Sequence, residues 1–360
     1  MPTFRPDLDQ IPYYDPGKPI EEVARELGID DIVKLASNES PTEPFPEVQA
    51  AIAATTPGIH RYPETTAHYL AEALATHHSV QMDQIWVGPG TTGILVSIAM
   101  ATTRAGTSAV FADPSFVVYP IGTAMSGGSS IRVALDADHR HDLVAMANAV
   151  RDDTVIVYVC NPNNPTGTHA RSTDIDRLLE SVPDRVLVVV DEAYAEYVTA
   201  PDYATAIPHA TARDNVVVTR TFSKVYGLAG LRVGYAIGQP DTIGALRRTQ
   251  VPFATTTLSQ VAAIESLRHP DSVASRIKDN AIGRELLTAG LRKRELLAID
   301  SQTNFVLFRP EGDARKFSDA LLHEGVIVRP MGPWIRVSVG TDFENRRFLA
   351  ALDEVMETGL

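Results

Sequence analysis

Cysteine is almost absent from this sequence of 360 residues, since Cys160 is its single representative. That excludes an internal disulfide framework and a cysteine-rich zinc site. Positive charge is also scarce, with 32 Lys and Arg against 45 Asp and Glu and a formal net charge of −13. Nucleic-acid binding depends on clustered Lys and Arg, so no nucleic-acid partner is expected. The longest apolar runs, such as Val186–Val190, fall far short of the ~20 residues that span a bilayer, so no membrane association is expected.

The N-terminus is rich in acids and prolines, in the sequence MPTFRPDLDQIPYYDPGKP. A secretory signal peptide would carry an apolar segment here, so we expect a cytoplasmic protein. Hydrophobic residues make up 44% of the chain and charged residues 21%, a balance typical of globular rather than disordered proteins. At about 150 residues per domain, the length predicts two domains.

Short runs rich in Val and Ile alternate with helix-length amphipathic stretches through the middle of the chain. Because the runs are nearly continuous, they are typical of strands buried on both faces of a mainly parallel sheet. Helical spacing in Ala67–His78 and Ser172–Ser181 completes a βαβα pattern, which predicts an α/β fold with helices on both faces of the sheet. The predicted strands are Ile85–Val87, Ala109–Phe111, Val155–Cys160, Leu187–Val190, Val216–Thr219 and Val233–Ile237.

The pattern changes after about residue 240, where a long helical stretch, Ser272–Leu297, precedes shorter strand-like runs. This order predicts a smaller α+β domain. The runs are Asn304–Phe308, Val326–Val328 and Ile335–Val339. The chain is therefore expected to comprise an N-terminal arm with a short helix at Glu21–Leu27 (1–30), which joins the small domain, a large domain (31–243) and a small C-terminal domain (244–360).

Glycines, an acid, a lysine, an arginine and an aromatic residue follow the ends of the predicted strands. In an open α/β sheet, ligands bind beyond the carboxyl ends of the strands, so these residues are expected to converge at one edge. The segments concerned are Gly88–Gly93 (GPGTTG), Asp113–Phe116 (DPSF), Asn161–Gly167 (NPNNPTG), Asp191–Tyr194 (DEAY), Arg220–Lys224 (RTFSK) and Gly227–Arg232 (GLAGLR).

This combination of residue types suits the chemistry of pyridoxal 5′-phosphate (PLP). A lysine forms a Schiff base with the coenzyme, and an acid keeps the pyridine nitrogen protonated so that the ring accepts electrons. Amides and hydroxyls of Gly, Ser and Thr, together with an Arg, hold the phosphate. The strand ends therefore predict a PLP site.

The chain resembles the fold-type I, class I/II aminotransferases, in particular the histidinol-phosphate aminotransferase-like family. The similarity extends over nearly the whole chain, in the motifs PYYDPGKP, KLASNES, IHRYPE, CNPNNPTG, DEAYAEY, RTFSKVYGLAGLRVGYAIG, VIVRP and WIRVSVG. It implies the PLP-transferase fold of type I, transamination as the reaction and PLP as the cofactor.

The resemblance also implies roles for residues around the coenzyme. Lys224 matches the Schiff-base lysine, which also moves the proton between substrate and coenzyme, and Asp191 matches the acid facing the pyridine nitrogen. Asn164 and Tyr194 match the donors to the ring oxygen, and Tyr194 completes the catalytic set. Phe116 matches the aromatic residue that stacks on the ring. The residues that match phosphate-binding positions are Thr91, Thr92, Thr221, Ser223 and Arg232.

Purely structural roles stay open for several of these positions. Asp191 is also a plausible helix N-cap, Asn164 a turn residue and Phe116 a core residue. Lys224 is less easily explained as a surface lysine, because buried-strand and glycine-rich sequences flank it.

The resemblance extends to the substrate and to a second subunit. Arg336 matches the arginine that clamps a substrate carboxylate, and Arg329 is a second cation nearby in the sequence. Tyr62 matches a tyrosine that reaches the phosphate of the neighbouring subunit, which implies a homodimer with shared sites. Asn38 resembles a loop residue beside the substrate, with a turn or N-cap role as the alternative. Tyr14 and Tyr119 are expected to line the pocket, with core packing as the alternative.

The glycine loop Gly88–Gly93 also satisfies the GxGxxG pattern of dinucleotide-binding proteins. Pro89 removes an amide donor from this loop, and no other motif resembles a hydride-transfer site, so the PLP interpretation is preferred. The histidines His77, His78, His139 and His141 show no metal-ligand spacing with a third partner, so no metal is expected.

The sequence departs from the histidinol-phosphate enzymes at two places. These commonly carry GNGSDE and PFNVN, where this chain has GPGTTG and PFATTT, so an amide for a substrate phosphate is missing at both. The chain looks more like the aromatic-amino-acid aminotransferase branch, and we expect transamination between Phe, Tyr or Trp and a 2-oxo acid such as 2-oxoglutarate. Alternatives within the family are a histidinol-phosphate aminotransferase and a decarboxylase of a phosphorylated hydroxy amino acid. A PLP-sensing regulator is a further alternative, but it would carry an additional basic DNA-binding module.

Overall fold

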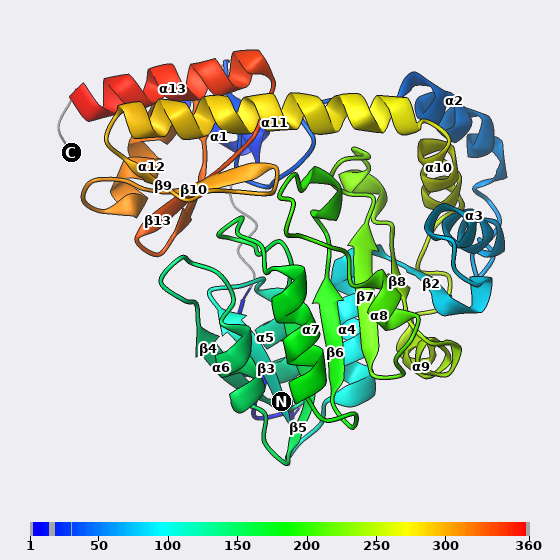
Figure 1. Cartoon of the computed structure of the whole chain (residues 1–360). Coiled ribbons are helices and arrows are strands. Elements are labelled where there is room, and N and C mark those ends of the chain that lie inside the picture. Colours follow the sequence, from blue (N-terminus) through cyan, green and yellow to red (C-terminus); the bar gives the residue numbers. More distant parts are fainter. Residues whose placement is uncertain (1–2, 14–18, 30, 358–360) are drawn as a thin grey trace.

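A mixed sheet of seven strands forms the centre of the larger part of the molecule in the computed structural model, which describes residues 3–13, 19–29 and 31–357 (Figure 1). Six of the strands run in one direction, and β8 is antiparallel to both of its neighbours. In spatial order the strands are β2 (Ile85–Gly88), β8 (Gly234–Ile237), β7 (Val216–Thr221), β6 (Leu187–Asp191), β5 (Thr154–Cys160), β3 (Ser108–Asp113) and β4 (Ser129–Ala134). The α/β fold expected from the sequence is confirmed.

The strands at the centre of the sheet are rich in valine. β6 is buried along its whole length, and β5 is buried except at Val155. β-branched side chains favour extended backbone, and burial on both faces explains why apolar residues run on without alternation. All six strands predicted from such runs are present, with ends shifted by one or two residues.

The sequence did not indicate β4, which lies at the edge of the sheet. Its side chains are exposed or only partly buried, and two serines and an arginine stand among the apolar residues. An edge strand has one solvated side and needs no continuous apolar run, so hydrophobic periodicity does not reveal it.

Helices cover both faces of the sheet. α6, α7 and α8 lie on the face that is turned to the viewer in Figure 1, and α4 and α5 lie behind the sheet. Separate apolar cores form on the two sides. The helices of this part are α2 (Pro46–Thr55), α3 (His68–His78), α4 (Gly90–Thr102), α5 (Val118–Met125), α6 (Leu143–Asn148), α7 (Ser172–Ser181), α8 (Ile207–Ala210), α9 (Pro240–Leu246) and α10 (Thr257–Leu267).

A second, antiparallel sheet belongs to the smaller part, in the order β12 (Arg329–Met331), β13 (Trp334–Ser338), β10 (Phe305–Arg309) and β9 (Leu297–Ala298). Its core is shared with the helices α11 (Pro270–Lys293), α12 (Ala314–His323) and α13 (Asp342–Glu357). The strand β1 (Val33–Lys34) pairs with β11 (Val326–Ile327), and Val23 of α1 (Ile20–Leu27) packs on this pair. The N-terminal segment thus joins the small part.

The link between the two parts is the 24-residue helix α11, which extends across the top of the molecule in Figure 1. α10, immediately before it, packs against α2 and α3 of the large part. The domain boundaries at residues 30/31 and 243/244 stay predictions. Within the described part of the chain, no helix combines the length and apolar character needed to traverse a bilayer.

Candidate active site

Three neighbouring parallel strands deliver the main polar groups to one edge of the large sheet. β5 is followed by the turn that holds Asn164, β6 ends at Asp191, and β7 is followed by Lys224. The register pairs Cys160 with Asp191 and Asp191 with Thr219, so the strand ends lie side by side. Carboxyl ends of parallel strands are where open α/β sheets bind ligands, and the predicted convergence is found.

Asp191 is a buried carboxylate, 2% exposed, and it accepts hydrogen bonds at both oxygens. The hydroxyl of Tyr119 donates to its Oδ2 at 2.9 Å, and the hydroxyl of Thr219 donates to its Oδ1 at 3.1 Å. Burial raises the pKa of Asp191 to about 6, and these hydroxyl donors oppose that rise. The carboxylate is therefore held in a fixed orientation behind the sheet edge.

The position of Tyr119 corrects the expectation that it lines the substrate pocket. Its side chain is 1% exposed and lies in the layer behind Asp191. Its ring stacks on Tyr158, with centroids 4.7 Å apart, and meets the edge of Phe116. No open ring face is left for a substrate. Tyr14, the other expected pocket residue, lies outside the described residues.

Lys224 points its amine at the loop that contains Asn38. The Nζ atom donates to the backbone oxygen of Asn38 at 3.0 Å and lies 5.4 Å from the centre of the Tyr194 ring. Burial lowers the pKa of Lys224 to about 7, and the nearby cation of Arg336 adds to this effect. A neutral amine is the nucleophile that carbonyl chemistry requires, so this lysine is prepared for imine formation near neutral pH.

Asn38 connects the large part to the small sheet. Its backbone has φ of 54°, its amide donates to the Tyr194 hydroxyl at 3.0 Å, and its Oδ1 accepts from the Ser338 hydroxyl at 3.1 Å. The amide of Asn304 binds its backbone oxygen at 3.1 Å. The structure therefore places Asn38 among site residues, in direct contact with Tyr194 and with the backbone oxygen that Lys224 binds.

Sequence reasoning missed Asn304 and Ser338, which complete this network. Ser338 shares a face of β13 with Arg336, while the alternate residues Ile335 and Val337 are fully buried in the small core. In IRVSVG, polar and apolar residues alternate, and this alternation could have predicted that one face of the strand carries the polar side chains Arg336 and Ser338.

Arg336 is 9% exposed and links three segments of the chain. Its Nη1 donates to Oδ1 of Asn164 at 2.6 Å, and its Nη2 donates to the backbone oxygen of Ala36 at 2.9 Å. The guanidinium lies 5.3 Å from the ring centre of Phe305. Arg329 is its cross-strand partner on β12, so the two side chains emerge on the same face of the small sheet. A planar cation in this position suits a carboxylate.

An anion-binding arrangement occupies the N-terminal end of α4. Thr91 and Thr92 lie in its first turn, where backbone N–H groups have no partner within the helix. The hydroxyls of Thr221 and Ser223 are 3.0 Å apart, and Arg232 donates to Ser223 at 3.2 Å.

Gly90 leaves room beside this arrangement. Its φ is +73°, and a Cβ atom there would lie 2.8 Å from Nη2 of Arg232. Amides, hydroxyls and a guanidinium thus surround a place where only glycine fits, which suits a phosphate group.

Phe116 and Tyr62 lie apart from each other. Phe116 is partly buried, and its ring packs nearly perpendicular to that of Tyr119, with centroids 5.8 Å apart. Tyr62 is 81% exposed and stacks on Phe253, with centroids 4.6 Å apart. The described contacts do not bring Tyr62 to Lys224 or Arg232 of its own chain.

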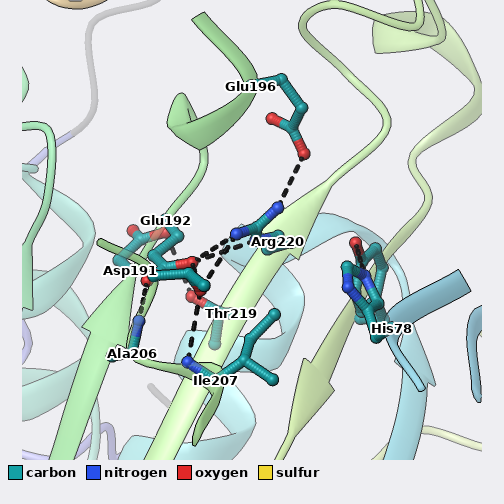
Figure 2. Close-up of polar contacts among 10 residues, drawn as sticks. His78, Asp191, Glu192, Glu196, Ala206, Ile207, Thr219 and Arg220 are labelled. Carbon is teal, nitrogen blue, oxygen red and sulfur yellow. Dashed lines mark hydrogen bonds and ion pairs between the residues drawn. The ribbon is translucent and has the colours of Figure 1, made fainter. Parts of the chain in front are cut away.

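A buried ionic network joins the ends of β6 and β7 at the residues that directly follow Asp191 and Thr219 (Figure 2). Glu192 accepts from Arg220 at 2.7 Å and from the backbone N–H of Ala206 at 2.6 Å, and Arg220 also pairs with Glu196 at 3.3 Å. The Glu192 side chain is fully buried and the Arg220 side chain is 12% exposed. Because side chains alternate along a strand, Asp191 and Thr219 form one pair and Glu192 and Arg220 form another, on opposite faces. Sequence reasoning missed this network.

No grouping of three or more His, Cys, Asp or Glu side chains suited to a metal ion occurs among residues 3–13, 19–29 and 31–357. Cys160 is a buried free thiol at the end of β5, and burial raises its pKa to about 12.

The donor set therefore fits PLP. A lysine with a lowered pKa, a buried carboxylate, two possible donors to a ring oxygen and a cradle for a phosphate are present. A Cβ atom at Gly90 would crowd the Arg232 guanidinium in that cradle. Together with the fold, this set defines a PLP-dependent enzyme of fold type I.

Comparison with known proteins agrees. A family model described as aminotransferase class I and II matches residues 30–352, and the chain belongs to that family. The solved structure of histidinol-phosphate aminotransferase from Sinorhizobium meliloti in complex with PLP superimposes with a TM-score of 0.91 at 30% identity, covering 99% of this chain and 98% of that chain.

Two curated relatives carry different substrate names. A histidinol-phosphate aminotransferase of Moorella thermoacetica is 41% identical over 362 residues, which covers 99% of this chain and 94% of the relative. An aromatic amino acid aminotransferase of Thermobifida fusca is 41% identical over 350 residues, which covers 97% of this chain and 96% of the relative. The chain is thus a PLP-dependent aminotransferase, and identity does not separate the two substrates.

Proposed function

We propose that this aminotransferase moves the amino group between an aromatic amino acid (Phe, Tyr or Trp) and a 2-oxo acid such as 2-oxoglutarate, in two half-reactions. The observation that carries the proposal is Arg336, a buried guanidinium oriented by Asn164 and by the backbone oxygen of Ala36. A planar cation held on two sides is prepared for bidentate binding of a carboxylate. An amino acid and a 2-oxo acid both carry that carboxylate, so the clamp would serve both half-reactions. Histidinol phosphate has no carboxylate, so with that donor the clamp would serve only the 2-oxo acid.

When bound, PLP supplies a ring that accepts electrons from the substrate Cα. In the proposal, Lys224 would hold the coenzyme, and its amine would carry the proton that leaves the substrate Cα. Asp191 pairs with the pyridine nitrogen, and Tyr194 and Asn164 donate to the ring oxygen. Thr91, Thr92, Thr221, Ser223 and Arg232 hold the phosphate. Arg336 fixes the substrate carboxylate so that Cα lies near the Lys224 amine.

Aromatic surface near the clamp supports the choice of substrate. Trp334 lies on the same face of β13 as Arg336, two residues away, and its ring meets the ring of His139 with centroids 5.1 Å apart. A phosphate would need more donors, and the amides common in histidinol-phosphate enzymes are replaced at Pro89 and in 254–257. Each missing hydrogen bond to a charged group costs roughly 1.5–3 kcal/mol.

Histidinol-phosphate transamination is the second candidate. It is favoured by Arg329, which is paired across the strands with Arg336, because two guanidinium groups on one face suit a dianion. Relatives that are 41–43% identical carry this name.

We also propose a homodimer. Tyr62 stacks on Phe253 and is largely exposed, together with the neighbouring exposed residues Ile59 and Tyr69 and the residue Val251. An exposed aromatic group with no described contact to the site residues of its own chain supports a role for Tyr62 at the phosphate of a second copy.

The deciding experiment measures kcat/KM for phenylalanine and for histidinol phosphate, each with 2-oxoglutarate as acceptor. We expect phenylalanine to be preferred. Arg336→Ala should lower kcat/KM for phenylalanine by about 10- to 150-fold, and Arg329→Ala should lower it less. A clear preference for histidinol phosphate, with equal losses in the two arginine variants, would establish the second candidate instead.

A further inference from the structure

The hydroxyl of Tyr119 has a position fixed by its surroundings. It is carried by α5, its ring is fully enclosed, and it donates to Oδ2 of Asp191 at 2.9 Å across 72 residues of sequence. The ring is packed on three sides by aromatic rings, those of Tyr158, Phe116 and Phe111. Such packing leaves the phenol little freedom to choose another partner.

Tyr119 remains a donor under all working conditions. Burial raises the pKa of its phenol well above the usual range, and the negative charge of Asp191 raises it further. A neutral phenol has one O–H to donate, and Asp191 accepts it.

Asp191 depends on such donors because its carboxyl group is buried away from solvent. Burial raises the pKa of its carboxyl to about 6, which places it close to neutral pH, and the Tyr119 hydroxyl is the strongest opposing influence. A group that pairs with a protonated pyridine nitrogen must itself be ionised. Two hydroxyl donors use two of about four acceptor sites, so sites remain for the coenzyme.

The other groups that face Asp191 cannot replace this donor. The Cys160 thiol donates to the backbone oxygen of Pro162 at 3.4 Å, and Glu192, itself an acceptor, is engaged by Arg220 on the opposite face of the sheet. The groups that act on Asp191 come from several elements: Tyr119 from α5, Cys160 from β5, Glu192, the backbone of Ala193 and Tyr194 after β6, Thr219 from β7, and Lys224.

We propose that Tyr119 is a positioning residue for Asp191. Its hydroxyl holds the carboxylate ionised and fixes its plane, so that free lone pairs face the pyridine nitrogen. The inference rests on the proposed role of Asp191, and it is independent of which amino acid is the substrate.

The test compares Tyr119→Phe with Tyr158→Phe. Both replacements remove one hydroxyl from a fully buried, mutually stacked ring, but no hydrogen bond joins Tyr158 to Asp191 among the described residues. The first measurement is infrared titration of the coenzyme-free full-length protein, which follows the band of the protonated carboxyl. Asp191→Asn identifies that band by removing it.

We expect Tyr119→Phe to move the midpoint of this titration upward by about one pH unit or more, and Tyr158→Phe to leave it in place. The second measurement is the Kd of PLP for the coenzyme-free protein. Tyr119→Phe should weaken binding about 10-fold at neutral pH, and the deficit should shrink as pH rises, because the carboxyl then ionises without help.

Equal shifts in both tyrosine variants, no shift in the midpoint, or a loss of PLP affinity that does not depend on pH would each overturn the proposal. If Tyr119→Phe does not fold, Thr219→Val removes the other hydroxyl donor and must raise the same midpoint. An unchanged PLP affinity in Asp191→Asn would refute the role of Asp191 itself, and the titration of Tyr119→Phe would still be informative about the hydrogen bond.

Discussion

At the scale of single residues, burial moves the two central ionisable groups of the site in opposite directions on the pH scale. It lowers the pKa of Lys224 to about 7 and raises that of Asp191 to about 6, because it disfavours the charged form of each. The amine gains nucleophilicity from this environment. The carboxylate loses ionisation, which the hydroxyls of Tyr119 and Thr219 counteract.

The first prediction concerns Lys224 in the coenzyme-free protein. The rate at which an acylating reagent modifies its amine should rise with pH, with a midpoint near pH 7. Mass spectrometry of the peptide that contains Lys224 measures this rate. Lys224→Ala should abolish transamination, and sodium borohydride should attach the coenzyme to Lys224 alone in the wild type. Attachment to a different lysine, or full activity of Lys224→Ala, would refute the assignment.

The free energy of unfolding should also reflect the lowered pKa of Lys224. Between pH 7 and about 10 the unfolded state binds the Lys224 proton and the folded state does not, so the free energy of unfolding should rise with pH there, by at most about 1.4 kcal/mol per pH unit. Urea unfolding of the coenzyme-free protein measures this slope. Lys224→Met should lack it.

The second prediction concerns Asp191. Asp191→Ala leaves the pyridine nitrogen without an anionic partner, so kcat and kcat/KM should fall together by about 100-fold or more. Asp191→Glu should retain part of the activity, limited by geometry. Steady-state kinetics with phenylalanine and 2-oxoglutarate measure the effect, and near-normal kcat in Asp191→Ala would show that another acid has this role.

At the scale of secondary-structure elements, one pair of strands serves both stability and chemistry. On one face of β6 and β7, Thr219 donates to Asp191, and on the other face Arg220 binds Glu192 (Figure 2). The ionic pair also reaches Ala206, just before α8, through the short bond from its N–H. A shift of either strand would therefore disturb Asp191.

The third prediction follows from this buried network. Arg220→Met leaves Glu192 and Glu196 buried without their cation, which should lower the free energy of unfolding by about 3–5 kcal/mol. Arg177→Met is the matched control, since Arg177 pairs with Asp174 at 3.2 Å and is 72% exposed, and it should change stability by about 1 kcal/mol or less. Urea denaturation compares them, and equal losses would contradict the prediction.

At the scale of the whole molecule, the small sheet closes the site by contributing residues to it. Arg336 of β13 binds Asn164 of the large part, and Ser338 binds Asn38. The residues proposed for the substrate carboxylate and those proposed for the coenzyme therefore come from different sheets. Orientation between the two parts decides whether the reacting atoms meet.

The fourth prediction tests the proposed homodimer. If Tyr62 serves the neighbouring subunit, mixed dimers of Lys224→Ala and Tyr62→Ala contain one intact site and one with both changes. Unfolding and refolding the two inactive or weakened proteins together should then raise activity above the sum of the separate samples. Sedimentation confirms the dimer, and a purely additive activity would place Tyr62 at the site of its own chain or at none.

The sequence alone determined the central fold and predicted most of the residues that gather at the candidate site. Buried strands are apolar runs such as Val186–Val190, and a functional residue stands at or shortly after the end of such a run, as Asp191 does at the end of β6. Such information is local: a few consecutive residues specify both the strand and the group at its end. The edge strand β4 was not predicted, because it is only partly buried and carries no continuous apolar run.

Only the tertiary structure decided which groups act on one another. Tyr119 meets Asp191 across 72 residues, and Asn38 meets Ser338 across 300 residues. Arg220 binds Glu192 because β6 and β7 pair in one register, and a slip of one residue would exchange the two faces. Periodicity places a side chain on a face, but the contact it makes there depends on packing between distant segments. The physical reason is that burial and partners, which set the charge of Lys224 and Asp191, exist only after the chain has folded.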